Sequence, residues 1–229
     1  MIKLAPLLMG LLYALAAYQF SAWRTKQELA KNSKPLDDPM LSPILGRLAK
    51  ALDLKKIHVN IYNVAPINGL AAPDGQIYLT KGFYDRYKSG LISAEQLASV
   101  VAHELGHVAL GHTRRRMIDF SGQNAMRILL GTVLGRIIPG VGPWLAGMMM
   151  RLLAARLSHR DEYEADEYAA ALMVKSGFGT DAQKSLLAAL PDLTGQKNAM
   201  PAWMLSHPDV ADRVQAIETL EEKWGLTQA

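Results

Sequence analysis

The stretch His103-Glu104-Leu105-Gly106-His107 reads HELGH and lies near the middle of a run with helical periodicity. On an α-helix its two histidines are four residues apart, so both imidazoles leave the same face and can bind one metal ion. Glu104 lies about 100° round the helix, where it can reach a water molecule on that metal without being a ligand. The alternative is a helix that carries two surface histidines and a glutamate by coincidence. The motif favours a zinc site over that alternative.

Signals on both sides of the motif predict where its helix begins and ends. Ser93-Ala94-Glu95-Gln96 is a capping-box pattern, with Ser93 as the N-cap and Gln96 reaching back to it. An apolar stripe for packing against the core follows, formed by Leu97, Val100, Val101, Leu105 and Val108. Gly111 offers a natural stop. We therefore expect packing to hold both histidines rigidly.

The third ligand of a catalytic zinc does not come from the residues directly after the motif. Such a site needs three protein ligands and one open position for water. The metzincin pattern HExxHxxGxxH would require glycine at 110 and histidine at 113, where the chain has Leu110 and Thr113. Gly111 and His112 each miss their place by one residue. We interpret His112 as a residue at the C-terminal end of the helix, where the dipole favours it.

An acidic segment later in the chain reads SHRDEYEAD over 158–166, and its Glu162 lies 55 residues after His107. Ser158 can cap a helix whose core face is formed by Ala165, Ala169, Leu172 and Met173. Glu162 and Asp166 are four apart, so they share one side of this helix. One carboxylate could bind the metal, and the other could accept a hydrogen bond from a ligand histidine. The alternative is an acidic, solvated first turn, which we accept for Asp161 and Glu164.

The segment before the motif predicts a helix and a small antiparallel sheet. Apolar residues recur at helical spacing over 41–54, and Ile57 to Tyr62 alternates as a half-buried strand with His58 on its exposed side. Asn68-Gly69-Leu70-Ala71-Ala72 precedes a Pro-Asp-Gly turn and a strand over 76–80. The edge formed by residues 68–71 could hold a substrate as an added strand, and an ordinary edge of small residues is equally possible.

The composition bounds the class of protein. A chain of 229 residues and 25.1 kDa can bury one good core, so we expect a single globular domain with attachments. The chain has no cysteine, which excludes disulfides, thiolate zinc sites, thiol catalysis and lipoprotein acylation. The net charge is +4, but Lys and Arg are scattered except at Arg114-Arg115-Arg116. Without a basic stripe interleaved with aromatic residues, nucleic acid is not an expected partner.

The N-terminal segment predicts attachment to a membrane. Leu4 to Trp23 carries no charge and is followed by Arg24 and Lys26, so we expect a transmembrane anchor over 1–23. A cleaved signal peptide is the alternative, with a small-x-small site at residues 14–16. The cations after the anchor favour a cytoplasmic domain, whereas a signal-like start favours export, so the orientation stays open. Residues 24–40 read as a linker or an arm along the surface.

A second apolar stretch lies between the two parts of the site. We expect a helical hairpin over about 126–156, divided by Pro139 and Pro143 into halves too short to cross a bilayer. The hairpin could pack over the cleft or dip into the membrane surface, with Arg114 to Arg116 contacting lipid phosphates. A buried hairpin with an exposed basic turn is at least as compatible with the sequence.

HELGH followed by S-x-R-D-E-Y-E-A-D resembles the HtpX-like and BepA-like membrane-associated zinc metallopeptidases, the gluzincin family M48, whose signature is HExxH followed by SRxxExxAD. The resemblance implies that His103 and His107 are zinc ligands and that Glu162 is the third ligand. It also implies that Glu104 is the general base and that Asp166 supports a ligand histidine. The chain departs from the signature at one position: His159 stands where the signature has arginine, and Arg160 follows one place later.

Two further stretches fit the same family. Residues 68–75 resemble its edge strand and turn, although Gly69 and Leu70 replace the usual pair. Ser206-His207-Pro208 followed by Arg213 resembles its late His-Pro motif. The resemblance implies that His207 lies near the zinc, where it could stabilise the oxyanion or occupy the open metal position in a resting state. A turn at the start of the final helix is the alternative for His207.

These observations predict a mainly α-helical α+β fold of the gluzincin type, with the metallopeptidase domain over 41–229. We expect a zinc-dependent metalloendopeptidase that cleaves extended or misfolded polypeptides, including membrane proteins, at or near a membrane lipid surface. The expected place is the bacterial inner membrane, on either face. The alternative is a membrane-tethered chaperone or adaptor with a closed zinc site, in which His207 is a fourth ligand. The CAAX-processing branch is less favoured because such relatives carry many membrane spans.

Overall fold

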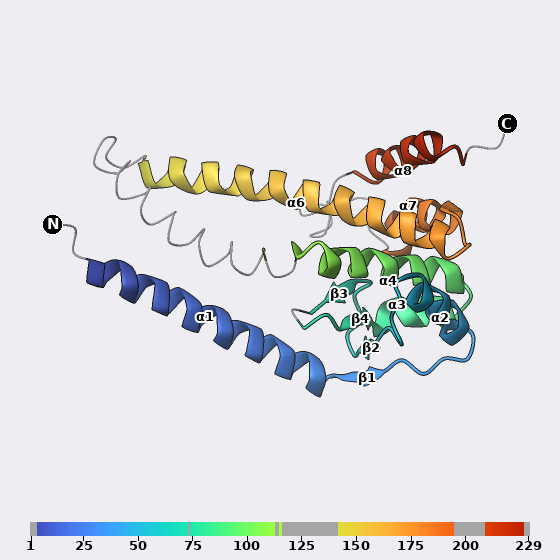
Figure 1. Ribbon diagram of the computed structural model, residues 1–229, viewed down its shortest axis with the longest axis horizontal. Helices are drawn as coiled ribbons and strands as arrows, with labels where there is room; N and C mark the ends of the chain where they lie inside the picture. Colours follow the sequence, from blue (N-terminus) through green and yellow to red (C-terminus); the bar gives the residue numbers. More distant parts are fainter. Residues whose placement is uncertain (1–3, 73, 113–114, 116–141, 195–208, 227–229) are drawn as a thin grey trace.

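The structure is a computed structural model that describes residues 4–72, 74–112, 115, 142–194 and 209–226 (Figure 1). It is mostly helical, with one small sheet, as expected from the sequence. The elements follow in the order α1 (Leu4–Lys31), β1 (Ser33–Pro35), α2 (Leu41–Ala51), β2 (Val59–Tyr62), β3 (Gly69–Ala71), β4 (Ile77–Thr80), α3 (Lys81–Lys88), α4 (Ala94–Ala109), α6 (Gly142–Lys175), α7 (Asp181–Leu193) and α8 (Val210–Trp224).

The sheet has the strand order β1-β2-β4-β3 and is mixed, which corrects the expectation of an antiparallel sheet. β1 pairs antiparallel with β2, and β3 pairs antiparallel with β4, but β2 and β4 are parallel. The chain reverses once between β2 and β3 and again at the turn before β4, where Gly75 has φ 83°. Two reversals restore the original direction, so β4 runs alongside β2. This arrangement leaves β3 at an edge of the sheet.

Helix α4 is the central element, because it contacts the sheet on one side and α6 and α7 on the other (Figure 1). Its capping box forms as expected: the Gln96 N–H donates to Ser93 Oγ at 3.1 Å, and the Ser93 N–H donates to Gln96 Oε1 at 2.7 Å. Gly111, with φ 71°, follows its C-cap. The apolar face of α4 belongs to the main core, which includes Leu41, Leu48, Ile77, Leu79, Leu97, Val101 and Met173.

Helix α6 is continuous from Gly142 to Lys175, which corrects the prediction that Ser158 caps a helix. The backbone before Ser158 is already helical, so no free N-terminal N–H groups exist there for a cap to satisfy. Pro143 is the second residue of α6, a position where proline is tolerated. The rest of the expected hairpin up to residue 141 lies outside the described residues, as do Arg114 and Arg116.

The N-terminal part of the chain contributes to the fold beyond the expected anchor. Helix α1 extends past Arg24 to Lys31, and β1 joins the sheet, so residues 24–40 divide between these two elements and a short loop. In this loop Asp38 is buried, and its Oδ1 accepts the N–H groups of Met40 at 3.0 Å and Leu41 at 3.2 Å. Over the residues searched, no helix is both long and apolar enough to cross a membrane. The anchor stays a prediction.

Candidate metal centre and active site

The two histidines of the HELGH motif lie on one face of α4 and point their Nε2 atoms at the same place. These atoms are 3.1 Å apart, and the two rings are nearly perpendicular, with centroids 4.7 Å apart. His107 is buried, whereas His103 is partly exposed to the cavity described below. Because α4 is capped at both ends and packed on both sides, its backbone holds the two rings in this arrangement.

Helix α6 brings Glu162 to the same place. Glu162 Oε2 lies 3.4 Å from His103 Nε2, and Oε1 lies 3.5 Å from His107 Nε2. The carboxylate is fully buried. This approach depends on a close helix crossing at Gly106, where a Cβ atom would lie only 3.1 Å from both Cα and the carbonyl oxygen of Ala165. A glycine at this position lets the two helices approach closely.

The three side chains fit a zinc ion. Their donor atoms all lie within 4.8 Å of one another. A tetrahedral zinc with bonds of about 2.0–2.1 Å holds its ligand atoms roughly 3.3 Å apart, which agrees with the separations between His103, His107 and Glu162. Two imidazoles and one carboxylate form the ligand set of a catalytic zinc, in which a fourth position stays open.

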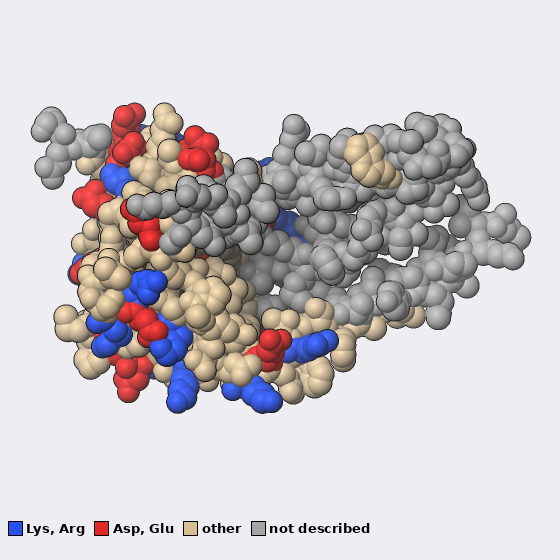
Figure 2. Space-filling view, turned by 180° about the vertical axis from the view of Figure 1, so that it is seen from behind, with Lys and Arg blue, Asp and Glu red and all other residues tan. Residues whose placement is uncertain are grey.

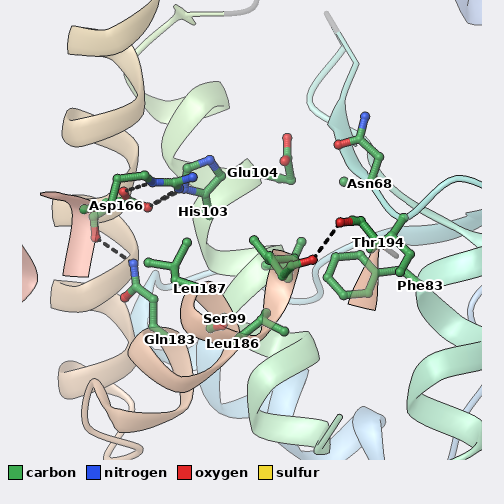
Figure 3. Close-up of a pocket in the computed structure, with 15 residues that line it drawn as sticks. Asn68, Phe83, Ser99, His103, Glu104, Asp166, Gln183, Leu186, Leu187 and Thr194 are labelled. Atoms are coloured by element: carbon green, nitrogen blue, oxygen red, sulfur yellow. Dashed lines mark hydrogen bonds and ion pairs between the residues drawn. The ribbon is translucent and has the colours of Figure 1, made fainter. Parts of the chain in front are cut away.

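The second ring nitrogen of His103, Nδ1, contacts a buried ion pair that joins α6 and α8. His103 Nδ1 lies 2.9 Å from Asp166 Oδ1, and Arg213 donates to both oxygens of Asp166 from Nε at 2.6 Å and Nη2 at 2.7 Å. Figure 3 shows Asp166 and His103 side by side at one end of the cavity. Asp166 lies at the place that the sequence predicts for it. Arg213 belongs to the late His-Pro motif but has no predicted role there, so its contact with Asp166 is known from the structure alone.

These contacts decide the protonation of the pair in the absence of metal. Burial would lower the pKa of His103, but its hydrogen bonds with Asp166 and Glu162 raise it to about 9. Burial would likewise raise the pKa of Asp166, but hydrogen bonds from Arg213 and His103 hold it at about 2. Asp166 is therefore ionised at neutral pH, and it can accept a hydrogen bond from the Nδ1–H group of His103 when Nε2 binds a metal.

The Nδ1 atom of His107 contacts His112, a residue that the sequence predicts at the C-terminal end of the helix. Gly111 adopts a left-handed conformation directly after the C-cap of α4, so His112 lies beyond this helix, and its side chain is fully buried. Its Nδ1 is 2.9 Å from His107 Nδ1, and its Nε2 is 3.0 Å from Glu164 Oε2. The dipole interpretation of His112 is therefore wrong. Spacing alone does not reveal this contact, because it depends on the turn at Gly111.

Asp161 and Glu164 also differ from the expected solvated turn. Asp161 is buried and forms an ion pair with Arg115, one of the three consecutive arginines. Glu164 is half-buried and accepts from Arg160 Nε at 2.7 Å, as well as contacting His112. The prediction fails because α6 has no exposed first turn at this point and packs this face against the end of α4.

Glu104 lines a cavity of about 100 Å³ between α4, α7 and the sheet edge. Figure 3 shows its side chain between His103 and Asn68, above an apolar floor that includes Phe83, Leu186 and Leu187. Strand β3 lies directly over it, because a Cβ atom on Gly69 would be 2.8 Å from Glu104 Oε1. The structure thus places the predicted base and two residues of the predicted substrate edge, Asn68 and Gly69, around one cavity, whereas Leu70 and Ala71 do not line it.

His207 lies outside the described residues, as do Ser206 and Pro208, so its predicted position near the metal stays a prediction. On the face shown in Figure 2, blue Lys and Arg side chains are interspersed with red Asp and Glu side chains over the described residues, without forming a continuous basic area.

A helix-borne HExxH motif with a carboxylate ligand from a second helix defines a metalloprotease. Comparison with known proteins agrees, because the model of peptidase family M48 matches residues 35–221. The chain is 26% identical over 177 residues to metalloprotease LoiP of Escherichia coli K12, covering 77% of this chain and 68% of the relative. The chain belongs to peptidase family M48, which confirms the resemblance found in the sequence.

Two further relatives are longer than this chain. It is 30% identical over 193 residues to the β-barrel assembly-enhancing protease of Escherichia coli O157:H7, covering 78% of this chain and 38% of that protein. It is 23% identical over 171 residues to mitochondrial metalloendopeptidase OMA1 of Danio rerio, covering 71% of this chain and 35% of that protein. The chain thus spans little more than a third of these two relatives, and the similarity covers the region that contains the site.

Proposed function

We propose that the protein is a zinc-dependent metalloendopeptidase that hydrolyses peptide bonds of extended or misfolded polypeptides at or near a membrane. One observation carries the proposal: His103 Nε2, His107 Nε2 and the Glu162 carboxylate converge at separations of 3.1–3.5 Å. The Glu104 carboxylate lines the adjoining cavity, beside the edge of the sheet. The site therefore combines a metal-binding set with a base that does not belong to that set.

Each group has a separate part in hydrolysis. When bound, zinc acts as a Lewis acid that lowers the pKa of a water molecule and polarises the scissile carbonyl. Glu104 removes a proton from the attacking water as its oxygen bonds to the carbonyl carbon. Glu104 then delivers that proton to the leaving nitrogen as the C–N bond breaks, which balances the reaction. Asp166, held by Arg213, keeps the His103 ring in the orientation that directs Nε2 at the metal.

The sheet edge supports an extended substrate. The backbone groups of Asn68 and Ala72 bond toward β4, through Thr80 N–H to Asn68 O at 3.0 Å and Ala72 N–H to Gln76 O at 2.9 Å. Alternate residues of a strand direct their N–H and C=O groups to opposite edges, so those of Gly69 and Ala71 are directed to the free edge. A peptide added there accepts backbone hydrogen bonds whatever its sequence, which suits unfolded substrates. The relatives named for β-barrel assembly support membrane proteins as one substrate class.

Helix α1 supports action at a membrane surface. Four large apolar side chains along it are 55–60% exposed, namely Leu12, Leu15, Phe20 and Trp23. The beginning of α6, with Trp144 61% exposed, lies at the same end of the molecule as the beginning of α1 (Figure 1). Exposed apolar groups of this kind mark contact with a membrane or a partner. We place the protein on a membrane, in keeping with the bacterial inner membrane expected from the sequence.

The membrane proposal is tested by flotation with vesicles of phosphatidylethanolamine and phosphatidylglycerol. The double variant Phe20→Ser with Trp23→Ser should bind at least about tenfold less vesicle, because two exposed apolar anchors are lost. The matched control is Leu54→Ser with Leu91→Ser, which changes two apolar residues of similar exposure after α2 and α3. Equal flotation of the two double variants would contradict the proposal.

The peptidase proposal is tested with the full-length chain, one equivalent of zinc and unfolded casein. Glu104→Gln should keep its zinc and lose cleavage by roughly 10²–10⁴-fold, the usual contribution of a general base. His103→Ala should lose the zinc. The matched control is Glu95→Gln, an exposed glutamate in the first turn of the same helix, which should cleave at the wild-type rate. Cleavage by Glu104→Gln at the wild-type rate would show that the assigned mechanism is wrong.

A further inference from the structure

A row of hydrogen-bonded side chains extends from the candidate metal centre away from the cavity. It begins at His107, whose Nδ1 is 2.9 Å from His112 Nδ1, and continues from His112 Nε2 to Glu164 Oε2 at 3.0 Å. The rings of His107 and His112 contact each other with centroids 5.1 Å apart. His112 has no exposed surface, although it lies beyond the end of α4. Nothing in the peptidase mechanism above uses His112 or Glu164.

The direction of the protons in this row follows from the metal site. His107 Nε2 is the atom that converges with His103 Nε2 and Glu162, so its lone pair is needed for the metal. A neutral imidazole with a free Nε2 lone pair carries its proton on Nδ1. His107 Nδ1–H therefore donates to His112 Nδ1. His112 must then carry its own proton on Nε2, from which it donates to Glu164.

We propose that His112 and Glu164 are positioning residues of the metal centre, which fix the tautomer and ring orientation of His107 as Asp166 and Arg213 do for His103. The inference rests on the zinc site of the proposed function, but it concerns metal binding and not cleavage. Each ligand histidine would then be held on its outer nitrogen by a partner from the α6 side or from the turn after α4. Groups that accept from a ligand histidine raise its basicity and its affinity for the metal.

The surroundings of Glu164 are consistent with an acceptor role. Arg160, four residues earlier on α6, donates from Nε to Glu164 Oε1 at 2.7 Å, so Glu164 Oε2 faces His112. The Arg160 guanidinium thus holds the Glu164 carboxylate in place beside His112. The row ends on a charge that is itself fixed by an ion pair.

A second metal site is the competing explanation, because ligand atoms of His112, Asp161 and Glu164 also lie within 4.8 Å of one another. Two positive groups already contact its carboxylates: Arg115 pairs with Asp161, and Arg160 pairs with Glu164. A cation placed there would be repelled by both guanidinium groups. It would also require the Nε2 lone pair of His112, which the hydrogen bond from His107 does not leave free. The geometry therefore favours positioning over a second ion.

The test is zinc affinity, measured on the full-length chain by competition with a chromophoric chelator. We expect His112→Leu to bind zinc about 10–100-fold more weakly than wild type, the range for loss of a group that supports a ligand. His112→Asn, whose amide oxygen can accept near the position of Nδ1, should recover most of this loss. Glu164→Gln, which keeps an acceptor but not the charge, should lose less than about tenfold. The control His58→Leu changes an exposed histidine before β2 and should bind as wild type does.

Two further readouts separate positioning from general loss of structure. The unfolding midpoint in excess chelator reports on the metal-free fold, and the visible spectrum of the cobalt(II)-loaded protein reports on ligand geometry. We expect a changed cobalt spectrum in His112→Leu together with partial return in His112→Asn. If His112→Leu does not fold, His112→Asn and Glu164→Gln carry the test through the cobalt spectrum.

Several outcomes would overturn the proposal. Zinc affinity and a cobalt spectrum unchanged in His112→Leu would refute it, and so would two zinc equivalents in wild type of which His112→Leu loses one. A wild-type chain that binds no zinc would refute both this proposal and the peptidase. A wild-type chain with one zinc and the predicted order of affinities, but without cleavage, would refute the peptidase alone and support the positioning role.

Discussion

Replacing Gly106 by alanine tests whether the close crossing of α4 and α6 sets the spacing of the metal-binding atoms. The added Cβ would lie 3.1 Å from Cα and from the carbonyl oxygen of Ala165, and 3.2 Å from Cβ of Tyr168. Carbon atoms prefer separations of about 3.5–4.0 Å. Two of these three contacts are backbone, so a change of rotamer cannot relieve them. The helices must separate by roughly 0.4 Å, and Glu162, one turn before Ala165, moves with α6.

The expected magnitudes follow from two opposing terms. Overpacking of a tight contact costs about 1–3 kcal/mol. Glycine to alanine inside a helix stabilises by about 1 kcal/mol. The net loss of stability of the metal-free protein is therefore up to roughly 2 kcal/mol. A separation of roughly 0.4 Å exceeds the tolerance of about 0.2 Å in metal–ligand distances, so we expect zinc affinity to fall at least about tenfold.

The assay combines urea unfolding in excess chelator with zinc competition. The matched control is Gly46→Ala in α2, where an added Cβ meets nothing within 4 Å. This variant should be stabilised by about 0.5–1 kcal/mol through helix propensity and should leave zinc affinity unchanged. If Gly106→Ala behaves like Gly46→Ala in both measurements, the crossing does not set the ligand spacing and the reasoning is refuted.

Three other substitutions have defined expectations. Arg213→Met leaves the carboxylate of Asp166 buried without its guanidinium partner. The free energy of unfolding of the metal-free protein in urea should therefore fall by about 3–5 kcal/mol. A decrease below about 1 kcal/mol would contradict the buried ion pair. Gly69→Ala places a Cβ 2.8 Å from Glu104 Oε1, so casein cleavage should fall about tenfold while zinc affinity stays constant. Equal losses of cleavage and zinc affinity would contradict the role of Glu104 as the base. Burial would raise the pKa of Asp38, but hydrogen bonds from a tyrosine hydroxyl and from backbone N–H groups lower it from 3.8 to about 2. Because the pKa of the folded state lies below that of the unfolded state, the carboxylate stabilises the fold by roughly 2 kcal/mol above pH 4. This contribution is lost as the pH falls from 4 to 2. The free energy of unfolding of Asp38→Asn, measured between pH 6 and 3, should lack this pH dependence.

Local features of the fold were predictable because short-range interactions determine them. Ser93 and Gln96 are three residues apart, and their capping box starts α4 as expected. Gly111 ends the helix region because it can adopt a positive φ. The strand after residue 56 was predicted from alternation, and the two later strands were predicted from the turn between them, each to within about two residues. The direction of β4 was not, because parallel pairing with β2 depends on the path of the intervening chain.

The second half of the site contains features that the sequence predicts and others that it does not. Glu162 and Asp166 could be placed on one side of a helix because their spacing is local. Ser158 resembles a cap only if the helix starts there, and the sequence does not show that α6 begins at Gly142. The contact of His112 with His107 depends on the left-handed conformation of Gly111, which lies between them. The contact of His112 with Glu164 joins residues 52 positions apart on different elements, and periodicity carries no information about it.

The central claim is that His103, His107 and Glu162 together bind one catalytic zinc. The most direct test is a crystal structure of the zinc-loaded full-length chain, with an anomalous difference map recorded at the zinc absorption edge. We predict one peak, about 2.0–2.2 Å from the Nε2 atoms of both histidines and from a carboxylate oxygen of Glu162. A map with no peak among these three side chains, or with its peak beside His112 instead, would contradict the claim.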